Sequence, residues 1–247
     1  MPASVTTSMA RAERTRPTPI ERQSPAAERE AEAPLSRNER LIRVINVIAA
    51  SLLLMLSAPF WFVIAIAIKL TSRGPVFYSQ TRVGMDYRRD SLREDSRRKM
   101  DMGGKPFIIW KFRTMTVDAE RNGAVWAKAG DQRVTLIGGF LRSCRLDELP
   151  QLINVIRGDM NLVGPRPERP ELFAELRNQI PDYQRRQRVR PGITGHAQVH
   201  LQYDTSVEDV KRKVQHDLEY IEQRSVWEDV KIMLKTIPVM LFRKGGW

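Results

Sequence analysis

Cysteine is almost absent from this sequence of 247 residues, in which Cys144 is the only example. The chain therefore cannot form an internal disulfide bond, which suits a reducing compartment. The sequence also lacks a glycine-rich phosphate-binding loop and a dinucleotide-binding fingerprint, which excludes the nucleotide-binding folds that those motifs define. Aromatic residues make up only 7% of the chain and do not alternate with the basic runs, so a nucleic-acid-binding surface is disfavoured.

Acidic residues are in the minority, since 41 lysines and arginines outnumber 29 aspartates and glutamates and leave a net charge of +12. The isoelectric point is accordingly near 10.2. Such a charge favours an anionic partner, which could be a nucleic acid, an acidic membrane face or a phosphorylated substrate. Charge alone does not choose among the three.

The first 38 residues are rich in Ala, Pro, Arg, Glu, Ser and Thr and show no hydrophobic period. We expect residues 1–38 to form a disordered tail. They do not read as a standard secretory signal, because the first apolar run begins only near Leu41.

The longest apolar run extends from Leu41 to Leu70 and predicts a membrane helix, which we place at residues 39–73. Between Arg43 and Lys69 roughly 25 residues carry no charge, which is enough for a helix to cross a bilayer. Basic residues flank both ends of the run, so the positive-inside rule gives it no orientation.

Pro59 lies near the middle of this run and predicts a bend, because proline removes a helical hydrogen bond. Ser57 stands two residues earlier and could bind the carbonyl that the proline frees. The residues leave two interpretations open. One is a kinked helix that spans the membrane, and the other is a re-entrant helix that enters and leaves through the same face.

Residues 74–247 predict a second domain of α+β class, mostly helical with a small β-sheet. Residues 106–115 are β-branched and aromatic enough for a strand, on which Lys111 and Arg113 would share a face. The charge-dense segment 86–104 reads as a surface insertion loop.

Helical spacing of apolar residues predicts two helices divided near residues 143–147 and another that opens at Ser206 with a Ser-x-x-Asp capping pattern. The last helix, VWEDVKIMLKTIPVMLF, is amphipathic. It could pack on the core or lie in a membrane interface.

Asp147 and Glu148 form an acidic pair in the basic sequence RLDELP. Asp147 is well placed as an N-cap for the following helix, in which case the pair is structural. In the functional interpretation, an ionised Asp147 is a nucleophile toward phosphorus, and Glu148 holds Mg²⁺ through oxygen.

Prolines flank Arg166 in GPRP, and a stiff turn, VRPGITG, contains Arg190, so both guanidinium groups would be presented to a phosphate at little entropic cost. His196 and His200 are four residues apart, but their surroundings indicate an extended chain. That conformation would separate them by more than about 10 Å and disfavours a metal site. Cys144 reads as a buried structural thiol rather than a nucleophile.

Together these motifs resemble the bacterial sugar transferases, the monotopic phosphoglycosyl transferases that act on polyprenol phosphate. The resemblance covers roughly residues 41–247 outside the 86–104 insertion. It is carried by the proline-broken apolar segment and by RGPVFYSQTRVG, PFIIWKFRTM, LRSCRLDELPQLINVIRGDMNLVGPRPERP, VRPGITG and DLEYIEQRSVWEDVKIMLKT.

The resemblance implies that Asp147 attacks the β-phosphorus of a UDP-sugar, releases UMP and passes the phosphosugar to polyprenol phosphate. Glu148 matches the Mg²⁺ ligand of the family. Arg142 and Arg166 match its phosphate-binding arginines, and Asp217 matches a further active-site acid. To the same substrate-binding set we add Lys111, Arg113 and Arg190.

The resemblance further implies that the membrane helix bends at Ser57 and Pro59 and is re-entrant, with residues 74–247 as a catalytic domain on the cytoplasmic face of a bacterial inner membrane. The expected partners are a UDP-sugar, polyprenyl phosphate and membrane lipid, with no nucleic acid; a homo-oligomer is compatible with the sequence. The chain differs from many members in lacking a Gly-Arg pair soon after Ala197-Gln198-Val199. That absence is the one feature that favours the alternative of a membrane-anchored binding protein with a degenerate active site.

Overall fold

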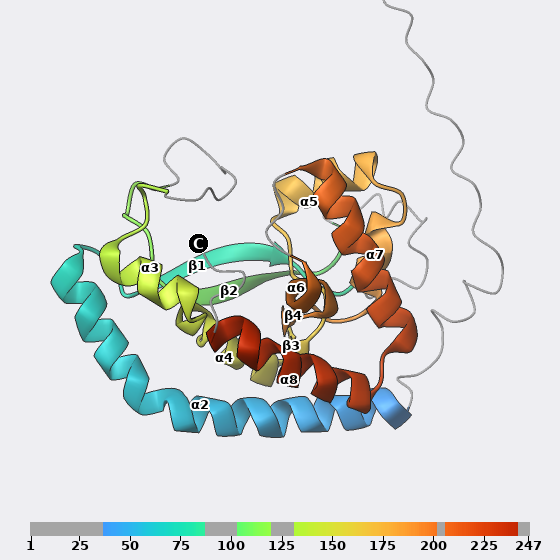
Figure 1. The fold of residues 1–247 in the computed structure, drawn as a ribbon, viewed down its shortest axis with the longest axis horizontal. Coiled ribbons are helices and arrows are strands. Elements are labelled where there is room, and N and C mark those ends of the chain that lie inside the picture. The colour runs from blue at the N-terminus through green and yellow to red at the C-terminus, as the bar shows by residue number, and fades with distance from the viewer. Residues whose placement is uncertain (1–36, 87–102, 120–130, 202–205, 242–247) are drawn as a thin grey trace, which may run out of the picture. The chain divides into compact units, whose positions relative to one another are not determined.

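The computed structural model describes residues 37–86, 103–119, 131–201 and 206–241, which all belong to one compact unit. The tail predicted at residues 1–38 and the insertion predicted at 86–104 lie almost entirely outside these residues. Figure 1 shows the arrangement of the described elements, and their labels are kept below.

The described residues contain more helix than strand, which confirms the predicted α+β class. The longer helices are α2 (Arg37–Thr71), α3 (Leu136–Ser143), α4 (Gln151–Arg157), α5 (Pro170–Gln179), α7 (Val207–Gln223) and α8 (Val226–Leu241). The short helical segments are η1 (Leu146–Glu148), η2 (Tyr183–Arg188) and α6 (His196–His200). The strands are β1 (Phe77–Val83), β2 (Pro106–Phe112), β3 (Asn161–Val163) and β4 (Gly192–Thr194).

The structure contains two small sheets among the described residues, where the sequence predicted one. Strands β1 and β2 pair antiparallel, with Tyr78 opposite Lys111, and β3 pairs parallel with β4. The predicted strand over 106–115 ends at Phe112, so Arg113 lies just beyond it.

Helix α2 is long and apolar, with Pro59 inside it, and its ribbon changes direction partway along in Figure 1. By length and composition it is long enough to cross a membrane. Ser57 donates its hydroxyl hydrogen to the carbonyl of Leu54 and accepts a hydrogen bond from the indole of Trp61. Pro59 frees the carbonyl of Met55, so the prediction that Ser57 binds the freed carbonyl is wrong. Ser57 binds the carbonyl of Leu54 instead.

Both halves of α2 pack on the rest of the unit. In the first half, Ala50 is fully buried in the main hydrophobic cluster, and Asn46 accepts a hydrogen bond from the backbone N–H of Leu162. In the second half, Ile64 and Ile68 are buried against other elements. The helix is thus tied to the unit on both sides of Pro59.

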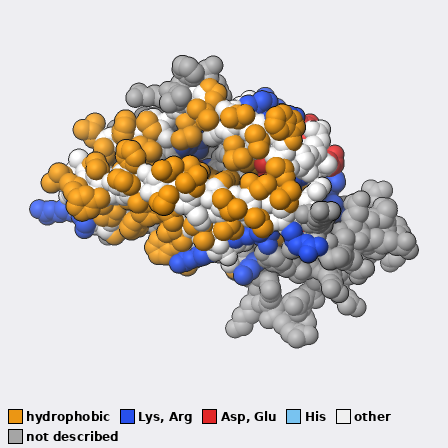
Figure 2. Space-filling model, turned by 90° about the horizontal axis from the view of Figure 1, so that it is seen from below, with side chains coloured by type: hydrophobic (Ala, Val, Ile, Leu, Met, Phe, Trp, Pro, Cys, Tyr) orange, Lys and Arg blue, Asp and Glu red, His pale blue; other side chains and the backbone are white. Residues whose placement is uncertain are grey.

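The side of the unit that carries α2 is strongly hydrophobic. Figure 2 views the molecule from this side, and hydrophobic side chains predominate on it, with lysines and arginines near its margin. The exposed hydrophobic side chains of α2 include Met55, Leu56, Phe60, Phe62, Val63 and Leu70, and Trp227, Leu234 and Ile237 of α8 are exposed as well.

The C-terminal helices follow their sequence signals. Helix α7 begins after Ser206, whose hydroxyl accepts a hydrogen bond from the backbone N–H of Asp209 while the Asp209 carboxylate accepts one from the Ser206 backbone, which completes a capping box. Val210 and Val214, four residues apart on this helix, are buried. The amphipathic helix predicted after residue 226 is α8, in which Ile232 is buried.

Candidate active site

The acidic pair lies where two helices are separated, as predicted, although the local geometry differs from the prediction. Helix α3 ends at Ser143, Arg145 adopts a left-handed backbone conformation with φ of 58°, and η1 then carries Asp147 and Glu148. Because a full 3-10 turn precedes α4, the residue at the N-cap of α4 is Pro150. The prediction that Asp147 caps this helix is therefore wrong.

Glu148 is buried and surrounded by cations from three separate segments. Its Oε1 accepts hydrogen bonds from Lys111 Nζ at 2.8 Å and from Arg166 Nη2 at 2.7 Å. Arg145 Nη1 lies 3.9 Å from its Oε2. Burial would raise the pKa of Glu148, but Arg166, Lys111 and Arg145 together hold that pKa well below its usual range.

Asp147 is also buried, and its environment acts in the other direction. Burial raises the pKa of its carboxyl group to about 6, against the opposing charges of Lys111, Arg142 and Arg166 and with the help of the neighbouring Glu148 charge. The functional interpretation of the sequence requires an ionised Asp147. In the structure the group is ionised at pH 7 but close enough to its pKa to be protonated in mild acid.

Lys111 and Arg166 are therefore confirmed as neighbours of the acidic pair. Lys111 comes from β2 and Arg166 from the proline-stiffened loop after β3, so the site joins three parts of the chain. Arg142 lies in the last turn of α3, and its positive charge lowers the pKa of Asp147.

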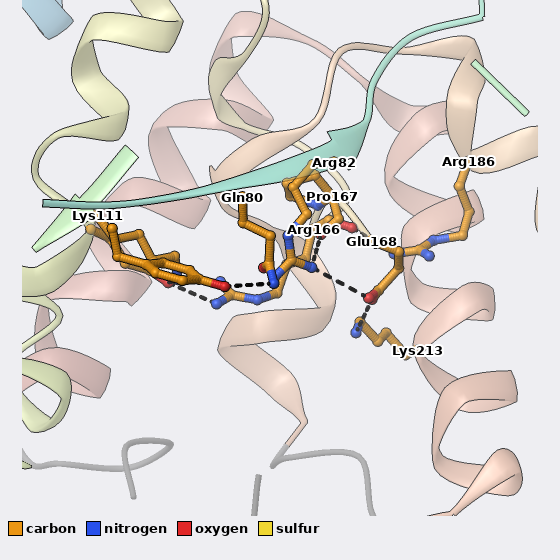
Figure 3. A network of polar contacts seen from close by, with 10 residues as sticks. Gln80, Arg82, Lys111, Arg166, Pro167, Glu168, Arg186 and Lys213 are labelled. Atoms are coloured by element: carbon orange, nitrogen blue, oxygen red, sulfur yellow. Dashed lines mark hydrogen bonds and ion pairs between the residues drawn. The ribbon is translucent and has the colours of Figure 1, made fainter. Parts of the chain in front are cut away.

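A network of polar side chains surrounds the loop that carries Arg166 (Figure 3). Arg82 Nη1 donates to the carbonyl of Pro167 at 3.0 Å and lies 3.8 Å from Glu168 Oε2. Lys213 Nζ donates to Glu168 Oε1 at 3.2 Å. Burial would raise the pKa of Glu168, but Lys213, Arg186 and Arg82 lower it to about 2, so the carboxylate stays charged and fixes this loop.

Asp217 belongs to this network and does not contact the acidic pair. Its Oδ2 accepts a hydrogen bond from Arg186 Nε at 2.8 Å, and both side chains are almost fully inaccessible to solvent. Arg186 Nη2 donates to the backbone carbonyl of Arg166 at 3.1 Å. Asp217 is therefore linked to Arg166 through Arg186 and a backbone carbonyl.

The structure does not bring Arg113 to the acidic pair. Its guanidinium group binds the backbone carbonyls of Ser72 and Arg73, just beyond the end of α2. Arg190 is also elsewhere, because its Nε donates to the carbonyl of Gly158 at 3.0 Å. Arg190 lines a separate pocket of about 320 Å³ whose other basic residues are Arg43, Lys105 and Arg157.

Several residues of the site were missed at the level of sequence. They are Arg145, which approaches Glu148, and the network residues Arg82, Glu168, Arg186 and Lys213. Glu168 directly follows GPRP, and this position is the one signal that could have drawn attention to it. Arg186 stands in the run QRRQR, where nothing distinguishes it from its neighbours.

The chemistry of Glu148 fits a magnesium ligand. Its low pKa keeps it anionic, and among the described residues only Arg145 lies within ion-pair distance of its Oε2. Magnesium is bound in proteins by one or two carboxylates together with substrate phosphates. Glu148 Oε2 could serve as such a ligand, with Asp147 beside it.

The family assignment agrees with this site. The model of the family described as bacterial sugar transferase matches residues 37–243. This chain belongs to the bacterial sugar transferase family, as its motifs indicated.

Similar proteins come from several bacteria. The chain is 42% identical over 210 residues to UDP-glucose:undecaprenyl-phosphate glucose-1-phosphate transferase of Escherichia coli K12, covering 83% of this chain and 41% of that protein. It is 43% identical over 201 residues to the protein of the same name from Caulobacter vibrioides, covering 81% of this chain and 69% of that protein. With UDP-N-acetylgalactosamine-undecaprenyl-phosphate N-acetylgalactosaminephosphotransferase of Aeromonas hydrophila the identity is 41% over 204 residues, covering 83% of this chain and 44% of that protein. The chain thus spans less than half the length of two of these three relatives.

Proposed function

We propose that this protein transfers a sugar 1-phosphate from a UDP-sugar to undecaprenyl phosphate and releases UMP. The observation that carries the proposal is the buried pair of Asp147 and Glu148 among Lys111, Arg145 and Arg166. A carboxylate nucleophile beside a cluster of cations suits attack on a diphosphate, since the cations offset the charge of the phosphates. The names of the relatives in Escherichia coli and Aeromonas hydrophila describe this type of reaction.

In the proposed first step, a carboxylate oxygen of Asp147 attacks the β-phosphorus of the UDP-sugar. A bond forms between that oxygen and phosphorus, and the bond from phosphorus to the oxygen bridging the two phosphates breaks. UMP leaves with the electron pair, and the phosphosugar remains on Asp147 as an acyl phosphate. The ionised carboxylate that this step needs is available at neutral pH, because the pKa of Asp147 is about 6.

In the second step, an oxygen of undecaprenyl phosphate attacks the same phosphorus. The bond to Asp147 breaks, the carboxylate is regenerated, and the product is undecaprenyl diphosphate sugar. Two displacements at one phosphorus allow a single buried carboxylate to serve both substrates in turn.

Glu148 is the proposed ligand for Mg²⁺ in this reaction. When bound, the cation would neutralise phosphate charge and so reduce repulsion of the attacking carboxylate. Lys111 and Arg166 share Oε1 of Glu148, and they would hold that side chain while Oε2 faces the cation. Arg142 and Arg166 are the proposed contacts to substrate phosphates.

We also propose that α2 is re-entrant and that the unit rests on the cytoplasmic face of the bacterial inner membrane. A helix of 35 residues is about 50 Å long, more than the roughly 30 Å of a hydrocarbon core. Ala50 before Pro59 and Ile68 after it are both fully buried against the same unit. A spanning helix would have to break one of these sets of contacts, whereas a helix bent near Pro59 keeps both. Met55 and Phe62, which flank the bend, are 66% and 71% exposed and would face lipid.

This topology predicts that both ends of α2 lie on the same side of the membrane. Cysteines introduced by Asn38→Cys and Thr71→Cys, each in a Cys144→Ser background, replace exposed residues at the two ends of the helix. A membrane-impermeant maleimide should label both in inverted membrane vesicles and neither in intact spheroplasts. Detergent-lysed cells, in which both must react, are the control. Labelling of only one of the two cysteines in intact spheroplasts would show that the helix spans, and labelling of both would place the unit on the outer face.

The proposed activity is tested by measuring UMP release from a panel of UDP-sugars with Mg²⁺ and undecaprenyl phosphate. UDP-glucose and UDP-N-acetylgalactosamine belong in the panel, since they appear in the names of the relatives. We expect UMP release with at least one of them, and an equal amount of lipid-linked product. If no sugar in a broad panel supports UMP release by folded protein, the proposed activity is wrong.

A further inference from the structure

All three histidines of the chain converge at one place (compare α6 and α7 in Figure 1). The sequence contains only three, and His196, His200 and His216 each offer a ring nitrogen within 4.8 Å of those of the other two. The ring centroids of His196 and His200 are 4.3 Å apart, and that of His216 is 5.2 Å from His196. This cluster is separate from Asp147 and Glu148.

The sequence prediction for this segment was wrong. An extended chain would have separated His196 from His200, but both lie on the short helix α6, four residues apart. Residues at this spacing project from the same face of a helix. Ala197 and Val199 between them pack inward, since Ala197 is buried and Val199 contacts the main hydrophobic cluster. Because these two side chains point toward the core, the two histidines project toward α7.

The hydrogen bonds of two of the three rings have the pattern of metal-binding histidines. Nδ1 of His200 lies 2.8 Å from the carbonyl of His196, and Nδ1 of His196 lies 3.3 Å from the carbonyl of His216. Nδ1 of His216 lies 3.6 Å from a carboxylate oxygen of Glu219, which is beyond hydrogen-bond distance, and it is buried without a hydrogen-bond partner among the described residues. A ring whose Nδ1–H donates to a carbonyl or carboxylate keeps the lone pair of its Nε2 for a metal.

We propose that His196, His200 and His216 bind one transition-metal dication of the Zn²⁺ class. Three imidazole nitrogens suit Zn²⁺, Co²⁺, Ni²⁺ or Cu²⁺ and not Mg²⁺, which prefers oxygen ligands. Nitrogens about 2.1 Å from a tetrahedral ion lie about 3.4 Å apart, so the rings must close by roughly 1 Å. His200 is exposed and can make this adjustment by rotating its side chain. A bound ion would tie α6 to α7, the helix that carries Asp217.

Lys235 of α8 competes with such an ion. Its Nζ lies 3.1 Å from Nε2 of His200, so the ammonium group donates to the nitrogen that the metal would take. The side chain of Lys235 is exposed and can turn toward solvent when an ion binds. Removing the charge of Lys235 should therefore strengthen metal binding. A cluster of rings that is only structural would show no such effect.

The test uses the full chain in detergent, purified without a polyhistidine tag and held in excess Mg²⁺. Zn²⁺ is titrated in competition with a chromogenic chelator, and Co²⁺ binding is followed by its visible absorption. We expect one equivalent of either ion, a melting temperature about 5 °C higher with saturating Zn²⁺, and a loss of affinity of about 100-fold in His200→Gln and in His216→Gln. Lys235→Met should bind several-fold more tightly than the unmodified chain.

Cys144→Ser is the matched control, because Cys144 is the only residue of the chain with a thiol, which binds Zn²⁺ strongly as a thiolate. It should bind like the unmodified chain. Loss of binding in Cys144→Ser with retention in His200→Gln would assign the ion to the thiol and overturn the proposal. Equal affinity of the unmodified chain, His200→Gln and His216→Gln would overturn it as well. Neither outcome depends on sugar transfer, so the proposed enzymatic activity is tested separately.

Discussion

Asp147→Asn should abolish UMP release, with a rate at least about 10⁴-fold below that of the unmodified chain. Asparagine has nearly the same shape, but its amide cannot form the acyl phosphate that the proposed reaction requires. The measurement is UMP release under single-turnover conditions with the preferred UDP-sugar and Mg²⁺. A trace of radiolabelled phosphosugar bound covalently to the unmodified chain, absent from the variant, would identify the intermediate.

The fold of this variant can be checked independently. Burial raises the pKa of Asp147 above its value in the unfolded chain, so at pH 7 the charged carboxylate is less stable in the folded site than in water. Replacing it with a neutral amide should leave the melting temperature unchanged or raise it. Glu148→Gln is the contrasting variant, because it leaves Lys111 and Arg166 without their carboxylate and should lower the melting temperature. Full activity in Asp147→Asn would rule out Asp147 as the nucleophile.

The same carboxyl group gives the reaction a pH dependence. Asp147 must be ionised to attack, and its pKa is about 6. UMP release should therefore rise about tenfold per pH unit below pH 6 and level off above it. A rate that is constant between pH 5 and 7 would contradict this assignment.

Local sequence signals identified the parts of the site that depend on nearby residues. The capping pattern at Ser206 and Asp209 fixed the start of α7, because both partners of the capping box lie within one turn. Arg166 was recognisable because two prolines restrict the backbone around it, and it does reach Glu148. In each case the physical cause is contained within a few residues of the chain.

Some of the errors concern residues whose partners are remote in the sequence. A guanidinium group binds a backbone carbonyl as readily as a phosphate, and Arg113 and Arg190 bind carbonyls of Arg73 and Gly158 that only the tertiary fold brings near them. The pairing of Arg186 with Asp217 joins residues 31 positions apart. Helix α6 has five residues, too few for a hydrophobic period to reveal it after a turn-rich segment.

Arg186→Met should destabilise the protein by about 3–5 kcal/mol, the second large effect that we predict. The variant leaves Asp217 buried without its hydrogen-bonded partner, in a place from which solvent is almost excluded and where burial raises the pKa of its carboxyl group. Denaturant titration of the protein in detergent measures this loss of stability. Arg185→Met is the matched control, since Arg185 is the adjacent residue and its side chain is 33% exposed. Among the described residues its side chain forms only long ion pairs, with Asp182 and Glu222. It should change the stability by less than about 1 kcal/mol.

The double variant Arg186→Met with Asp217→Leu separates stability from positioning. Removing both charges should restore most of the lost stability, because no uncompensated charge remains buried. UMP release should stay low, however, because the restored protein still lacks the Arg186 group that holds the backbone carbonyl of Arg166. If Arg186 acts by positioning Arg166 against the substrate phosphates, the deficit will appear mainly as a higher KM for the UDP-sugar. A double variant that recovers activity together with stability would show that the pair only supports the fold.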